Sequence, residues 1–79
     1  MTMWKQITNR PDAIVNERVI DSEKLLSMMA QLHFLKQAGE DIVLHEEVDA
    51  HYHVTAYIVE RKHPARFGER PIITRFEKL

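Results

Sequence analysis

One stretch decides how the rest of the chain is arranged: residues 22–38 read SEKLLSMMAQLHFLKQA. Asp21 or Ser22 can cap its first turn, because a short side-chain oxygen accepts a hydrogen bond from a free backbone N–H there. Gly39 follows its last turn, where a left-handed residue commonly ends a helix. Apolar residues recur at the spacing of one helix face. They are Leu25, Met28, Met29, Leu32 and Leu35. The stretch therefore predicts an amphipathic helix with one face to bury.

Five segments outside this helix are typical of β-strands, being rich in β-branched and other apolar residues. They are residues 4–8, 14–20, 41–48, 50–61 and 72–77. A helix beginning at Pro11 is the alternative for residues 11–20, since proline suits the first helical position. We favour strands and expect the order β-β-α-β-β-β. This order predicts a small α+β fold, in which one helix packs on one face of an antiparallel sheet of about five strands.

The clearest alternation lies in residues 50–61, where successive side chains of a strand point to opposite faces. One row is mostly apolar, and we expect it to face the core: Ala50, Tyr52, Val54, Ala56 and Ile58. The other row contains His51 and His53, with Asp49 in line. The two imidazoles are therefore expected on the solvent-facing side of the strand.

These histidines raise the hypothesis of a metal site. Two imidazoles on one face, with a third ligand from a neighbouring strand, can hold zinc or a similar ion. His45 or Glu47 could supply that ligand if residues 41–48 and 50–61 form a hairpin. Histidines on an ordinary polar strand face explain the pattern more simply, so we expect no metal or other cofactor and keep metal binding as the third hypothesis.

The size of the chain favours self-association. With 79 residues it forms one small domain, residues 1–79, and such a domain buries only about 60% of the surface that its unfolded chain exposes. Small chains commonly add disulfides, metals or oligomerisation, and the absence of cysteine excludes the first. No apolar run approaches the roughly 20 residues of a membrane span, and the N-terminus lacks the pattern of a signal peptide. We expect a cytoplasmic protein that does not enter membranes.

Catalysis is not expected. Acidic residues near the histidines could orient an imidazole as a general base: Glu46, Glu47 and Asp49. However, no serine stands in a nucleophile motif, and the sequence has no glycine-rich phosphate loop. We therefore predict that the protein acts by binding.

The formal net charge of −1 conceals an uneven distribution. Residues 1–60 carry five basic and ten acidic side chains, whereas residues 61–79 carry six basic and two acidic ones. Three interpretations remain open. The basic segment could bind nucleic acid through phosphate contacts and one stacking aromatic, it could meet the acidic segment of a second copy, or the two could neutralise each other within one sheet.

Two places are candidate contact surfaces for a partner. Phe34 lies on the side of the helix opposite Leu25, where polar residues are expected. Arg66, Phe67 and Arg70 lie in the loop at 63–71, where arginine can bind carboxylates and the aromatic ring can fill a pocket. We therefore expect a self-associating accessory protein that binds another protein, of a kind that would suit a bacterium or a phage. A nucleic-acid-binding module that uses residues 61–79 is the alternative.

Overall fold

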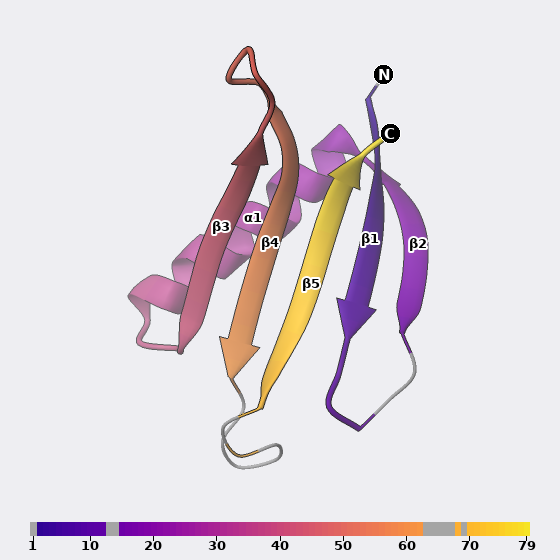
Figure 1. Ribbon diagram of the computed structural model, residues 1–79. Coiled ribbons are helices and arrows are strands. Elements are labelled where there is room, and N and C mark those ends of the chain that lie inside the picture. The colour runs from indigo at the N-terminus through magenta and orange to yellow at the C-terminus, as the bar shows by residue number, and fades with distance from the viewer. Residues whose placement is uncertain (1, 13–14, 63–67, 69) are drawn as a thin grey trace.

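A computed structural model, which describes residues 2–12, 15–62, 68 and 70–79, shows one helix packed against one face of a five-stranded sheet (Figure 1). The elements follow one another as β1 (Met3–Asn9), β2 (Asn16–Asp21), α1 (Ser22–Gln37), β3 (Ile42–Val48), β4 (Val54–Lys62) and β5 (Pro71–Lys78). This is the small α+β fold that the sequence predicts, with the helix between the second and third strands.

The last strand lies in the middle of the sheet. The spatial order is β2-β1-β5-β4-β3, and all four neighbouring pairs are antiparallel. The hairpins β1–β2 and β3–β4 therefore form the two outer parts, and β5 joins them. Figure 1 shows the helix crossing behind the sheet at a slant, so that it leaves parts of the same sheet face uncovered on both of its sides.

Both ends of α1 have the capping chemistry that the sequence predicts. The Asp21 carboxylate accepts a hydrogen bond from the Lys24 N–H at 2.8 Å, so Asp21 is the N-cap. At the other end, the N–H groups of Gly39 and Glu40 donate to the carbonyls of Lys36 and Leu35. This pattern is a Schellman motif, which places its glycine in the left-handed region, and Gly39 has a φ of 103°.

The core lies between the helix and the sheet and receives one buried residue from each element. These residues are Trp4, Ile20, Leu25, Ile42, Val59 and Phe76. The rest of the predicted helix stripe packs against them in partly buried positions: Met28, Met29, Leu32 and Leu35. The helix and its buried face are therefore confirmed.

The prediction for residues 50–61 is partly wrong. Strand β4 begins only at Val54, and residues 50–52 form a turn. The rows are also reversed, because Val59 and Tyr57 contact the core on the helix side. The sequence misleads here because both rows carry large apolar residues between positions 54 and 59, so alternation alone does not decide which row faces the helix.

The structure also decides between the two alternatives for residues 11–20. Residues 16–21 form strand β2, so the alternative of a helix across residues 11–20 is wrong. His33, which stands beside the apolar stripe of α1, is exposed. Among the described residues, the single helix is too short and too polar to cross a membrane.

Candidate binding surface

The outer side of α1 carries an apolar ridge that no other part of the described chain covers. Phe34 is 68% exposed, as is Leu26, and Ala30 between them is also exposed. Residues four apart form a continuous row on a helix surface, so Leu26 and Phe34 are about 12 Å apart along the axis, with the small alanine at the midpoint. We call these three residues the helix ridge.

An apolar hollow lies beside Leu26, at one end of the helix ridge. It has a volume of about 290 Å³ and lies between α1 and the sheet. Its lining contains no carboxylate and no lysine or arginine: Trp4, Ser22, Leu25, Leu26, Met29, His33 and Tyr57. The ridge therefore has a protruding aromatic ring at one end and an apolar recess at the other.

Comparison of the chain with known protein families, curated proteins and solved structures finds no match.

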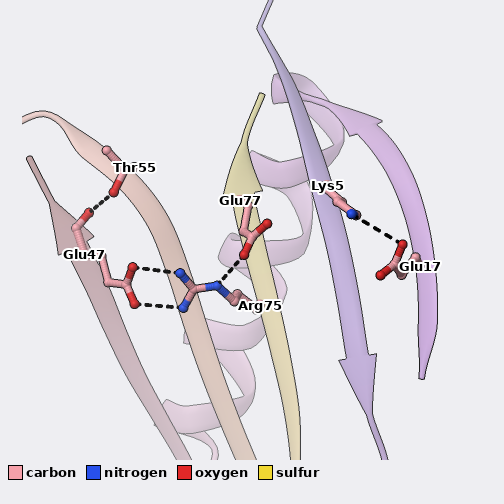
Figure 2. A network of polar contacts seen from close by, with 6 residues as sticks. All are labelled: Lys5, Glu17, Glu47, Thr55, Arg75 and Glu77. Carbon is pink, nitrogen blue, oxygen red and sulfur yellow. Dashed lines mark hydrogen bonds and ion pairs between the residues drawn. The ribbon is translucent and has the colours of Figure 1, made fainter. Parts of the chain in front are cut away.

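The opposite face of the sheet, which the helix leaves open, carries a polar network (Figure 2). Arg75 on β5 donates from both terminal nitrogens to the Glu47 carboxylate on β3, each at 2.8 Å, and from Nε to Glu77 at 2.7 Å. Strand β4 lies between β5 and β3, and its residue Ala56 stands in register with both Glu47 and Glu77. The small side chain of Ala56 lets the guanidinium reach across the intervening strand.

This network changes the acid–base properties of its members. The hydrogen bonds from the Arg75 guanidinium hold the pKa of the Glu47 carboxyl below its ordinary value. The same bonds, together with the one to Glu77, raise the pKa of Arg75. Lys5 and Glu17 form a second ion pair on this face at 3.5 Å (Figure 2). The open face thus carries paired charges beside exposed apolar side chains such as Val19 and Val43.

Carboxylates of the acidic segment, residues 1–60, bind cations of the basic segment, residues 61–79, within the same chain. Besides the pair of Glu47 and Arg75, Glu40 accepts a hydrogen bond from Arg61 at 2.9 Å. Among the described residues, Arg61 and Arg75 of the basic segment are therefore bound by carboxylates from the acidic segment. This is the neutralisation within one sheet that the sequence left as one of three interpretations.

The predicted loop surface is only partly visible. Arg66 and Phe67 lie outside the described residues, and Arg70 is exposed immediately before β5. The structure therefore places only the helix part of the predicted partner surface. Phe34 is exposed on the side where the helical spacing predicts it.

The candidate metal ligands do not gather on one strand. His51 and His53 belong to the segment between β3 and β4, where Asp49 Oδ1 accepts hydrogen bonds from both of their backbone N–H groups. Their rings are 6.3 Å apart. His45 lies on β3, three residues before the last residue of that strand, so about 10 Å of strand separates it from the start of the segment that carries His51 and His53. Among the described residues, no group of three or more histidine, aspartate or glutamate side chains is placed to hold a metal ion.

Leu26 and the hollow were not predicted from the sequence. Leu26 stands eight residues before Phe34, with Ala30 midway, so a second apolar row at spacing i, i+4, i+8 was present. The sequence contained no such signal for the hollow, because the hollow depends on how the rings of Trp4 and Tyr57 pack beside the helix. The centroids of these two rings are 5.6 Å from each other.

Proposed function

We propose that this chain is a small cytosolic interaction protein, which acts by binding and self-associates through the helix ridge. The supporting observation is the pair Leu26 and Phe34, two large apolar side chains that are equally exposed on one row of α1. The occupant that fits this row best is a second copy of the same chain.

The ridge is self-complementary. In a two-fold symmetric contact, residue i of one copy meets residue j of the other and the reverse. An axis beside Ala30 sets Leu26 of each copy against Phe34 of the other, because both lie four residues from the centre. The alanines allow the helices to approach closely, and rows of residues four apart form the commonest helix-packing class. Each Phe34 then points toward the apolar hollow beside the other copy's Leu26.

Charge is compatible with this contact. The ridge itself has no charged residue, and the same two-fold pairing brings Glu23 of one helix toward Gln37 of the other, where an amide can donate to a carboxylate. The two helix dipoles run in opposing directions. The small core gives self-association a reason, since a domain of this length gains little net stability alone.

The nucleic-acid alternative has less support. It relies on the cations of residues 61–79, and both Arg61 and Arg75 are held by carboxylates. Charges neutralised in this way release few counterions when a phosphate backbone approaches. We therefore propose protein binding ahead of nucleic-acid binding.

Molar mass in solution tests the proposal. Light scattering after size exclusion should give twice the chain mass of 9.3 kDa for the unmodified protein. Phe34→Ser should give the single-chain mass. Each buried phenylalanine contributes about 2 kcal/mol, and symmetry counts it twice, so the dissociation constant should rise about a thousandfold.

Ala30→Lys gives a second, sharper variant. Lysine is a good helix former at an exposed position, but at the axis it places two like charges face to face. Val19→Thr is the matched control, because Val19 is an exposed apolar residue on β2, away from the helix ridge, and threonine keeps its shape. A single-chain mass for the unmodified protein at millimolar concentration, or an unchanged dimer in Ala30→Lys, would contradict the proposal.

A further inference from the structure

The side of the sheet that faces the helix changes from apolar to polar along its length. On β1, the buried Trp4 is followed in the same row by Gln6 and Thr8. On β5, Thr74 stands in the same row as the fully buried Phe76. Polar side chains at positions that face a helix are unusual, because such positions normally complete the core.

These polar side chains form a line that retains hydrogen-bonding capacity. Arg18 Nε donates to Gln6 Oε1 at 2.7 Å, whereas the contacts of Gln6 with Thr8 and of Thr8 with Thr74 are each 3.5 Å long. Contacts of that length are weak. The two hydroxyl groups can therefore donate to, or accept from, another molecule.

A hollow of about 340 Å³ lies between this polar line and α1. Leu32 and Leu35 of the helix form one wall, and Ile72 and Val59 contribute from the sheet. A second hollow of about 370 Å³ continues it toward β2 and shares Arg10 with it. Leu35 and Ala30 are about 140° apart around the helix, so these hollows lie on the flank of α1 away from the helix ridge.

Positive charge without a carboxylate partner borders this space. Arg10 lines both hollows, and Arg18 lines the second. Within the described ranges, Arg10 makes no ion pair, and the contacts of Arg18 are with the neutral Gln6 oxygen and with Met28 Sδ at 3.9 Å. The Glu17 carboxylate also lines the second hollow, and it pairs with Lys5 at 3.5 Å.

We propose that this hollow, together with the second hollow that adjoins it, is a binding site for a small aliphatic carboxylic acid. The carboxylate is held by Arg10 and Arg18, whose planar guanidinium groups match carboxylate geometry. The hydrocarbon part lies along Leu32 and Leu35, and the hydroxyl groups of the polar line contact the polar end. A volume of 340 Å³ holds about ten water-sized units, which corresponds to a ligand of about ten non-hydrogen atoms. Apolar walls with a few converging polar groups are typical of ligand sites.

Titration with octanoate, followed by nitrogen-15 NMR, tests this site. Octanoate has the expected size, and octanamide is its uncharged counterpart of the same shape. Octanoate should shift the amide signals of Thr8, Thr74 and Leu32 in a saturable way. Octanamide should bind with an affinity at least about tenfold lower, because it lacks the charge. Inorganic phosphate should bind weakly, since it lacks the apolar part.

Variants separate a specific site from general stickiness. Arg10→Gln and Arg18→Gln should each weaken octanoate binding about tenfold and leave octanamide binding unchanged. Lys78→Gln is the matched control, because it removes an exposed cation at the far end of β5. The proposal is overturned by equal affinity for octanoate and octanamide, by shifts confined to Leu26 and Phe34, or by no saturable shift. A dimer that does not form leaves this result unaffected, because the two surfaces lie on different flanks of α1.

Discussion

Arg75 connects β5 to β3 across the intervening strand β4, and it binds two carboxylates. Its bidentate contact with Glu47 spans β4, and its Nε contact with Glu77 stays on β5. Bidentate arginine–carboxylate pairs are the surface ion pairs with the best geometry, and networks contribute more than isolated pairs. This residue therefore stabilises the arrangement of the strands as well as their surface.

The Glu47 carboxyl gives the fold a dependence on pH. Its pKa is lower in the folded chain than its ordinary value of 4.5, because Arg75 donates hydrogen bonds to its charged form. Such a group stabilises the fold above that ordinary value, and the contribution is lost as the pH falls through the folded pKa. Glu47→Gln should therefore lower the free energy of unfolding at pH 7 and have little effect near pH 2.

Urea unfolding at the two pH values measures this difference. Glu46→Gln is the matched control, since Glu46 is exposed on the same strand and makes no ion pair among the described residues. An equal loss of stability for Glu47→Gln at both pH values would show that the ion pair does not contribute.

The positions of single residues were predictable where a local rule fixed them. Asp21, Gly39 and the exposure of Phe34 follow from capping chemistry and helical spacing alone. The pairing of Glu47 with Arg75 did not, because it depends on a sheet order that brings residues 28 apart in the chain into contact.

Among the elements, the turn between β3 and β4 is the one that departs from the expected pattern. Asp49 accepts two backbone N–H bonds, and Tyr52 adopts a φ of 63°. A non-glycine residue in this region is uncommon and strained. The sequence alternates through residues 50–53 as a strand would. However, the Asp49 side chain binds backbone N–H groups that a strand ladder would otherwise use, so it favours a turn over a strand. Strand β4 therefore begins only at Val54.

Tyr52→Gly should stabilise the protein. The tyrosine side chain is 85% exposed, so little packing is lost, and glycine adopts a positive φ without steric cost. After subtraction of the extra chain entropy of glycine, the free energy of unfolding should rise by about 0.5–1 kcal/mol. Tyr52→Ala keeps the strain and is the control. Urea unfolding that shows equal stability for both variants would contradict this account.

At the scale of the whole molecule, the proposed self-association predicts that stability depends on protein concentration. A second copy that binds only the folded chain raises its melting temperature by mass action. For two chains of this length, a tenfold increase in concentration should raise the midpoint by about 4 °C. Calorimetry across a hundredfold range checks this, and Ala30→Lys should show no such increase. A constant midpoint for the unmodified protein would contradict self-association.

The fold class, the helix and all five strands could be predicted from the sequence, because each depends on local periodicity. The order of the strands in the sheet could not be predicted, nor could the residues that line the hollows on the two flanks of the helix. Gln6, Thr8 and Thr74 alternate with apolar residues as any surface strand does, and only the position of α1 reveals that they line a hollow.

The central position of β5 sets the order in which the chain can fold. Its backbone ladder with β1 joins residues about 70 positions apart, and its other ladder holds β4. Until β5 is in place, the two hairpins have only α1 in common. Long loops must close before these contacts form, so we expect folding to be slow for a domain of this size, and synthesis on the ribosome delivers the strand that completes the sheet after all the others.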